Sequence, residues 1–283
     1  MTLETYDRFG RVGIWSGALT GSAGRDAAAE LEELGYGTIW LGGSPDFGDA
    51  LPILDATERI TVATGIISIW EQDAASVAAE IAKLDGPTGE RFFLGLGASH
   101  ESLTPGYTRP YSKMVSYLDE LDAAPVPVPV ERRVLAALGP KMLRLAAERS
   151  LGVHPYLVTP EHVAQSRAEI GPEVLLAPEL GVVLDPDVSR GREVARRAIA
   201  RYLSLPNYTD NWLRRGFAED DLADGGSERL VDALYAVGDL ETILARVAAF
   251  HAAGADHVAL QVLPATPGLP YAEWRELAAA LSL

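Results

Sequence analysis

Residues 25–43 of the chain read RDAAAELEELGYGTIWLGG. The first part, Arg25 to Leu34, favours an amphipathic helix, and Gly35 supplies the residue that a left-handed C-terminal cap prefers. The apolar run from Thr38 to Gly42 follows at once and predicts a buried strand. A helix that leads directly into a buried strand is half of the crossover unit that joins parallel strands.

The same alternation of short apolar runs and longer amphipathic stretches continues along the chain and predicts eight strands. They are Val12–Ser16, Thr38–Gly42, Thr61–Ile66, Phe92–Gly97, Val134–Leu138, Val153–Leu157, Leu175–Leu184 and His257–Leu263. Eight strand–helix units in 283 residues match the size of a TIM barrel, and parallel strands buried on both faces read as continuous apolar runs. We therefore expect an α/β fold, a single (β/α)8 TIM-barrel domain spanning residues 1–283.

A doubly wound open sheet is the alternative fold. Its dinucleotide-binding form needs a Gly-x-Gly-x-x-Gly turn after the first strand. Here the glycines of that region are Gly13, Gly17, Gly21 and Gly24, and their spacing does not fit the motif. The barrel is therefore the favoured architecture.

An insertion is predicted between strands seven and eight, because Asp185 to Asp256 is longer than one crossover needs. Within it, Leu205–Gly226 is expected to shape a lid over the pocket, with Glu219–Gly226 as loop. Asp239–Ala253 predicts an amphipathic helix that Gly254 closes. Elsewhere, Thr159 before Pro160 predicts a helix N-terminus.

Composition excludes several classes of function. The chain has no cysteine, which removes disulfides, thiolate metal sites and Cys nucleophiles, and its five histidines are dispersed without the spacing of a metal site. A net charge of −16 opposes binding to nucleic acid and to anionic membranes. With no apolar run of ~20 residues and no secretory leader, we expect a cytoplasmic protein that acts on a small molecule.

In a TIM barrel the functional residues follow the strands. This rule selects Trp15 and Ser16, Gly42 to Ser44, Gly65 to Trp70, Gly97 to His100, Ala137 to Lys141, and His154 to Thr159. The most physical signal among them is Leu138-Gly139-Pro140-Lys141, which opens a helix. Free backbone N–H groups, the positive helix end and an ammonium group would converge there and favour an anion. An ordinary loop with a solvated lysine is the alternative.

Four segments resemble the luciferase-like flavin and deazaflavin oxidoreductases, often called the bacterial luciferase-like monooxygenase family. They are Ala29–Trp40, Ala63–Ile66, Leu84–Gly89 with Arg91–Gly97, and Val134–Met142. The compact length and Leu203–Trp212 look more like the branch that uses coenzyme F420 than like the FMN monooxygenases. The resemblance implies a homodimer and a ring bound in the barrel mouth, over a non-proline cis peptide at the end of strand three.

The resemblance also implies a set of site residues. Cofactor-binding positions are Gly65, Ile66, Gly97, Ala98, Ala137, Leu138, Gly139, Pro140, Lys141 and Met142. His100 is the candidate general acid or base, because imidazole suits proton transfer near neutral pH, although a loop histidine is often only solvated. Trp15 and Trp70 would form aromatic walls or simply fill the core. His154 on strand six is expected to be a satisfied core histidine, with a position at the barrel mouth as the alternative.

One departure from the family concerns the end of strand two. The family's sugar-phosphate dehydrogenases carry an acidic residue and a histidine there, whereas this chain has Gly42-Gly43-Ser44, so their substrate is not transferred and Ser44 is a substrate-binding candidate. The expected activity is an F420-dependent oxidoreductase that moves a hydride to or from an unidentified substrate. Alternatives are an FMN-dependent monooxygenase, a non-catalytic flavin-binding protein, and a lyase or isomerase of a phosphorylated substrate.

Overall fold

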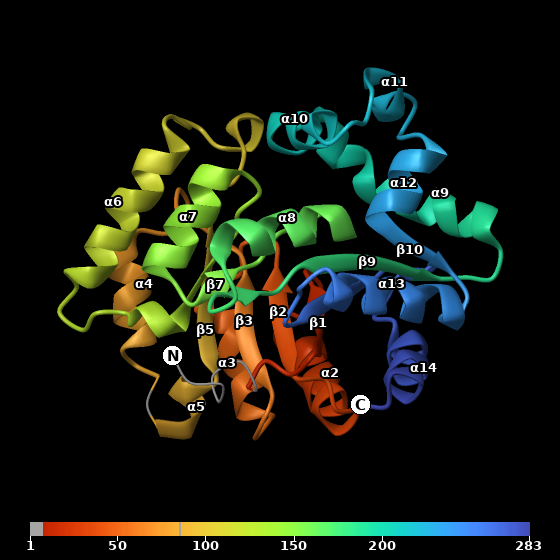
Figure 1. Ribbon diagram of the computed structural model, residues 1–283. Helices are drawn as coiled ribbons and strands as arrows, with labels where there is room; N and C mark the ends of the chain where they lie inside the picture. Colours follow the sequence, from red (N-terminus) through yellow and green to blue (C-terminus); the bar gives the residue numbers. More distant parts are fainter. Residues whose placement is uncertain (1–7, 85) are drawn as a thin grey trace.

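The computed structural model describes residues 8–84 and 86–283 (Figure 1). Asp85, which belongs to the third segment of the family resemblance, lies outside the described residues. The strands are β1 Val12–Ser16, β2 Thr38–Gly42, β3 Thr61–Gly65, β4 Ile67–Ser68, β5 Phe92–Gly97, β6 Arg133–Leu135, β7 Gly152–Val153, β8 Leu175–Leu176, β9 Glu179–Leu184, β10 Tyr235–Gly238 and β11 Val258–Val262. The α-helices are α2 Gly21–Glu33, α3 Phe47–Asp55, α4 Ala74–Ile81, α5 Gly86–Glu90, α6 Pro110–Asp122, α7 Pro140–Arg149, α8 Pro160–Ile170, α9 Val188–Ile199, α10 Pro206–Arg214, α11 Glu219–Leu222, α12 Glu228–Leu234, α13 Leu240–Ala252 and α14 Tyr271–Leu281, and the 3-10 helices are η1 Glu101–Leu103, η2 Val130–Arg132 and η3 Ala200–Ser204.

The strands form one parallel sheet in the order β10-β9-β11-β1-β2-β3-β5-β6-β7-β8, with β4 beside β5. β8 and β9 are two parts of one extended segment, interrupted at Ala177 and Pro178. The first part pairs with β7, and the second pairs with β11 and β10. Backbone bonds from Ala177 N to Val153 O (2.9 Å) and from Ala259 N to Pro178 O (2.9 Å) flank the interruption. The segment thus joins both ends of the ring, and the predicted (β/α)8 barrel is confirmed.

Alternate residues of each strand face the barrel interior and the surrounding helices. On β2, Ile39 and Leu41 belong to the core under the helices, whereas Trp40 points into the interior with Phe9 and Phe93. Trp40 stacks on His154 at a centroid distance of 4.1 Å, and its indole N–H donates to Nε2 of His257 at 3.0 Å. These aromatic side chains fill the interior of the barrel.

The insertion between β9 and β11 folds as a small helical unit with its own core. Figure 1 shows α9 to α12 together at the upper right, beside β10, which adds to the edge of β9. Trp212 and Tyr235 are fully buried in this core with apolar residues of α9 and α12. The insertion therefore holds a fixed place over the barrel.

The sequence predictions are confirmed in their main points and wrong in several boundaries. β1 and β2 have the predicted bounds, Gly35 has a φ of +90°, and Thr159 accepts a hydrogen bond from His162 N at 3.3 Å. The predicted strand 175–184 is interrupted, since a proline cannot donate a ladder bond at position 178. The predicted loop 219–226 contains the helix α11, because Asp221 caps it by accepting from Ala218 N.

Two strands, β4 and β10, were not predicted, and some predicted strands are shorter than expected. β10 covers only Tyr235–Gly238 and continues the apolar run of α12 without a break, so no turn signal separates the two elements. β6 and β7 contain only 133–135 and 152–153. In the described part of the chain, no helix has the length and hydropathy that a bilayer crossing requires.

Candidate functional site

Three cavities adjoin one another at the carboxyl ends of the strands. The mouth cavity, of about 680 Å³, is lined by Trp15, Ser44, Gly65 and Ile66 of the barrel and by residues 201–208 of the insertion. The middle cavity, of about 300 Å³, shares Ile66, His100, His154, Tyr156 and Tyr208 with it. The arginine cavity, of about 530 Å³, shares Leu138, Gly139 and Arg214 with the middle cavity. The shared residues place the three cavities next to one another in a row, the cavity path.

The end of β3 forms the floor of the mouth cavity. The peptide bond between Gly65 and Ile66 is cis, as the family resemblance implies. The indole N–H of Trp15 donates to the carbonyl oxygen of Gly65 at 2.9 Å. A Cβ atom on Gly97 would lie 2.5 Å from Cδ1 of Ile66, so only glycine at position 97 leaves the Ile66 side chain its place. The three positions together set the shape of the floor.

His154 lines both the mouth and the middle cavity and has an unpaired ring nitrogen. Its side chain is buried, at 2% exposure, and Nδ1 donates to the carbonyl oxygen of Ala177 at 2.6 Å. Burial lowers the pKa of His154 to about 4, so the ring is neutral near pH 7. Nε2 is then an acceptor, and it has no partner among the described residues. The prediction of a satisfied core histidine is wrong on this point.

His100 lies where the mouth and middle cavities meet. Asn207 of α10 is 3.3 Å from its Nδ1, and the imidazole packs against Tyr208 at a centroid distance of 5.2 Å. Burial first, and then the positive charge of Arg201, lower the pKa of His100 below 6.5. His100 is therefore neutral near pH 7 and can accept a proton.

Phenol groups form the wall that faces these histidines. Arg201 donates to the hydroxyl oxygen of Tyr202, Tyr202 donates to Tyr156 at 3.1 Å, and Tyr156 donates to Gln261 Oε1 at 2.8 Å. Burial raises the pKa of Tyr156 well above 10, which keeps this phenol protonated. The hydrogen bonds thus run in one direction, from Arg201 to Gln261, and hold the two phenol side chains in position.

The opening turn of α7 lies between the middle and arginine cavities. Gly139 is the N-cap residue and no side chain caps the helix, so the positive end of α7 lies at these cavities, although Pro140 has no N–H group and Met142 N donates to Gly139 O at 3.1 Å. Leu138 and Gly139 line both cavities, whereas Lys141 is exposed and lines none of the three. Arg214 of α10 also lines both, and it makes no hydrogen bond or ion pair within residues 8–84 and 86–283. The insertion thus brings a free guanidinium group to this turn.

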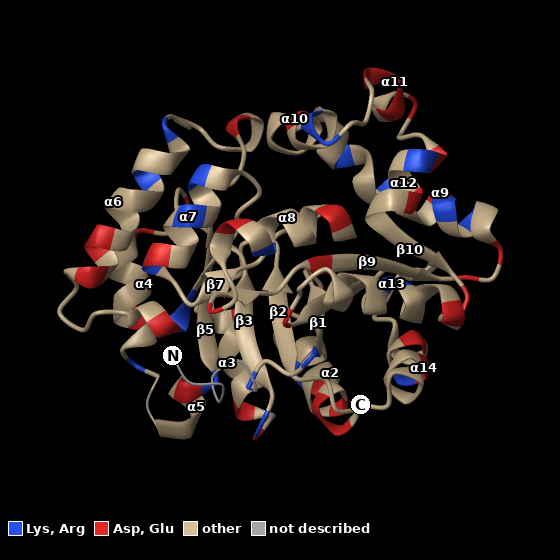
Figure 2. Cartoon of the chain, viewed as in Figure 1, with Lys and Arg blue, Asp and Glu red and all other residues tan. Residues whose placement is uncertain are grey.

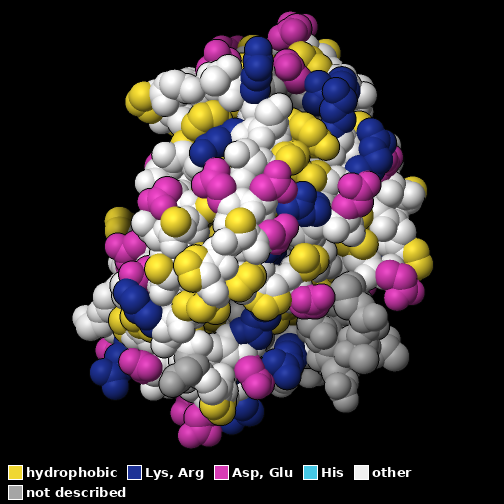
Figure 3. Space-filling model, turned by 90° about the vertical axis from the view of Figure 1, so that its left-hand side faces the viewer, with side chains coloured by type: hydrophobic (Ala, Val, Ile, Leu, Met, Phe, Trp, Pro, Cys, Tyr) yellow, Lys and Arg dark blue, Asp and Glu magenta, His cyan; other side chains and the backbone are white. Residues whose placement is uncertain are grey.

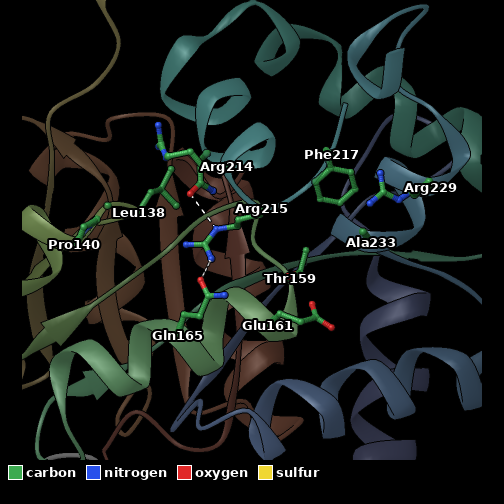
Figure 4. Close-up of a pocket in the computed structure, with 12 residues that line it drawn as sticks. Leu138, Pro140, Thr159, Glu161, Gln165, Arg214, Arg215, Phe217, Arg229 and Ala233 are labelled. Atoms are coloured by element: carbon green, nitrogen blue, oxygen red, sulfur yellow. Dashed lines mark hydrogen bonds between the residues drawn. The ribbon is translucent and has the colours of Figure 1, made fainter. Parts of the chain in front are cut away.

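Two further arginines on the same cavity are held by other groups (Figure 4). Arg215 donates to Asn211 Oδ1 at 3.1 Å and to Gln165, and Arg229 pairs with Asp221 at 2.6 Å while lying 4.6 Å from the ring of Phe217. Figure 2 shows basic residues on α10 and α12 beside the acidic α11. On the face shown in Figure 3, acidic and basic side chains are interspersed without a patch of one sign.

The structure brings most of the predicted site residues to this path. Those that line a cavity are Trp15, Ser44, Gly65, Ile66, Gly97, Ala98, His100, Ala137, Leu138, Gly139, Pro140 and Met142. Lys141 and Trp70 do not. The indole N–H of Trp70 donates to Ala98 O at 2.7 Å and supports the loop after β5 from behind. The described residues contain no cluster that could hold a metal ion.

Sequence reasoning assigned no role to the aromatic wall or to the arginines. Tyr156 falls within the strand end 154–159, which the strand-end rule does select. Arg201, Tyr202, Tyr208 and Arg214 belong to the insertion, and no sequence pattern shows which strand ends an insertion covers. The unusual density of Tyr and Arg in residues 201–215 is the signal that could have drawn attention to them.

Comparison with known proteins places this chain in a family. Residues 10–121 and 111–257 match the sequence profile of the luciferase-like monooxygenases. The chain belongs to this family. A search of curated proteins gave no match to this luciferase-like protein.

Solved structures share its fold at low sequence identity. An F420-dependent secondary alcohol dehydrogenase in complex with an F420–acetone adduct has a TM-score of 0.73 and 15% identity, covering 96% of this chain and 98% of its own. The coenzyme F420-dependent tetrahydromethanopterin reductase from Methanopyrus kandleri has a TM-score of 0.65 and 17% identity, covering 94% and 96%. The FMN-bound oxygenating constituent of 3,6-diketocamphane monooxygenase, from Pseudomonas putida, has a TM-score of 0.66 and 16% identity, covering 96% of each chain. Both kinds of cofactor therefore occur on this fold.

Proposed function

We propose that this luciferase-like protein is a coenzyme F420-dependent oxidoreductase that transfers a hydride between the deazaflavin and a small organic substrate. The observation that carries the proposal is the row of three adjoining cavities. It begins over Gly65 and Ile66, passes the positive N-terminal end of α7, and ends among arginines. A planar ring with a long anionic side chain matches that sequence of surfaces.

The ring end of the path contains a buried acceptor that needs a donor. Nε2 of His154 has no partner in the described structure, and a buried acceptor without one costs about 1–3 kcal/mol. A flavin or deazaflavin ring offers an N–H group and an apolar face, which suit His154 and Ile66 respectively. The residues present therefore fit a ring of this type.

The anionic end distinguishes the two cofactors. FMN ends at its phosphate, whereas the side chain of F420 continues past its phosphate into carboxylates. The turn at Gly139 with Arg214 would hold a phosphate, and the arginine cavity beyond offers room and positive charge for more. In a protein of net charge −16, such a cluster of guanidinium groups favours an anionic ligand.

Bound F420 would supply the hydride acceptor or donor, and the protein's own residues supply position and a proton partner. His100 would hold or give the proton at the substrate oxygen, since its neutral ring can accept one near pH 7. The tyrosine wall would exclude water from the mouth cavity. The substrate would bind near Trp15 and Ser44, which line the same cavity.

An FMN-dependent monooxygenase is the second candidate, favoured by the FMN-bound relative of equal coverage. Side-by-side titrations of the purified protein with F420 and FMN, followed by cofactor fluorescence, separate the two. We expect F420 to bind at least about tenfold more tightly, because FMN leaves the arginine cavity unfilled. Tighter binding of FMN would refute the choice of cofactor, and binding of neither would refute the proposal.

Assembly stays a prediction from the family resemblance, and location stays a prediction from the sequence. We expect a homodimer, which light scattering after size-exclusion chromatography measures directly. We also expect a cytoplasmic protein, which cell fractionation measures. Neither expectation enters the argument for the cofactor.

A further inference from the structure

Among the described residues, Arg201 alone brings a permanent positive charge to the lining of the mouth cavity. Many arginines of this acidic protein pair with a carboxylate, as Arg133, Arg167 and Arg192 do. Arg201 forms no such ion pair within residues 8–84 and 86–283. Its charge is therefore left available to whatever occupies the cavity.

The guanidinium group of Arg201 is nevertheless held in place. It donates a hydrogen bond to the hydroxyl oxygen of Tyr202, lies 4.6 Å from the centre of the same ring, and also interacts with the hydroxyl of Tyr156. Arginine has five N–H donors in a fixed fork, so these phenol contacts leave several of them free. A positioned fork with free donors matches the geometry of a carboxylate.

Arg201 also lies close to the proposed proton partner. Its positive charge contributes to the lowered pKa of His100, which lines the same cavity. An anion bound by Arg201 would therefore lie at the reacting end of the site. Trp15 and Tyr156, at a centroid distance of 5.3 Å, give the same cavity an aromatic wall that suits an apolar body.

We infer that the mouth cavity takes substrates with one carboxylate group on an apolar or aromatic body, and that Arg201 binds the carboxylate. The inference deepens the proposed function and rests on it for the reaction, although not for the anion site itself. A single negative charge is preferred because Glu71 lines the same cavity and repels a second one. Arg201 is then the residue that determines substrate specificity.

The test compares binding of benzoate, benzamide and phenyl phosphate by calorimetry, with and without saturating F420. The variants are Arg201→Gln, Arg201→Lys and the control Arg197→Gln, which removes an exposed charge of α9 outside the cavities. We expect wild type and R197Q to prefer benzoate over benzamide by about tenfold or more. R201Q should lose that preference, and R201K should keep part of it, because a lysine keeps the charge without the fork.

Equal binding of benzoate and benzamide to wild type, or an unchanged preference in R201Q with an unchanged melting temperature, would overturn the inference. Tighter binding of phenyl phosphate than of benzoate would overturn the carboxylate class. F420 affinity is measured in the same samples. Loss of F420 binding with a retained benzoate preference would refute the proposed cofactor and support the anion site.

Discussion

Glu179 offers a test of how burial governs the stability of this fold. It begins β9 at 1% exposure, Oε2 accepts from Leu157 N at 3.1 Å, and Oε1 has no partner among the described residues. Burial raises the pKa of this carboxyl from 4.5 to about 8, against a smaller opposing effect of the Leu157 N–H. The folded protein therefore keeps a proton near pH 7 that the unfolded chain releases.

The magnitude follows from that pKa difference. The stabilising contribution is complete below about pH 4.5 and is lost as the pH rises toward 8, by ~1.4 kcal/mol per pH unit. Glutamine has a similar shape, can keep the bond from Leu157 N, and does not titrate. The free energy of unfolding of Glu179→Gln, relative to wild type, should thus rise by about 3 kcal/mol between roughly pH 5 and pH 7.5.

Urea unfolding followed by tryptophan fluorescence measures this difference in free energy at each pH. The comparison requires that the slope of the unfolding free energy against urea concentration is the same in E179Q and wild type. Glu148→Gln removes the same charge from an exposed position on α7 and is the matched control. Its stability should follow that of wild type at every pH. A difference between E179Q and wild type that stays constant with pH would refute the reasoning.

Three further predictions concern the site. Arg214→Gln should weaken F420 binding by about 1–2 kcal/mol, roughly 5- to 30-fold, whereas Lys141→Gln should change the affinity by less than about twofold. Titration of each variant with F420, followed by cofactor fluorescence, measures both affinities, and a larger loss in K141Q than in R214Q would contradict the structure. Gly97→Ala should displace the Ile66 side chain and weaken F420 binding by about 1 kcal/mol, while circular dichroism shows little change in secondary structure. An unchanged F420 affinity would show that Ile66 does not support the ring. In a steady-state assay, His100→Ala should lower turnover by about 10²- to 10⁴-fold, while the dissociation constant of F420 changes less than about threefold. Unchanged turnover would remove His100 from the mechanism.

Local sequence signals predicted the barrel well because its strands and caps are local features. The run from Thr38 to Gly42, the glycine at 35 and the threonine at 159 each act within a few residues. The interrupted strand 175–184 and the short β10 were not predicted correctly, since the neighbours that define them come from distant parts of the chain. Pattern and propensity contain no information on such pairings.

The site was predicted in part for the same reason. The strand-end rule selected Ser44, Gly65 and His100, and each lines the mouth cavity. The free helix end at Gly139 was also recognised, because it depends on adjacent residues. The guanidinium group that accompanies it belongs to Arg214, in the insertion, and only the folded chain brings the two together. Likewise, the sequence does not show that Nδ1 of His154 donates to the carbonyl oxygen of Ala177, which leaves Nε2 as the unpaired acceptor.

The short segment 201–215 contacts the path at both of its ends. Arg201 lies in the mouth cavity, while Arg214 lies at the turn before the arginine cavity. With the roles proposed for these two arginines, exchange of this one segment between relatives would change the choice of redox partner and the choice of substrate in a single step. The segment is a natural unit for grafting, and evolution on this scaffold could diversify both selectivities while leaving the barrel untouched.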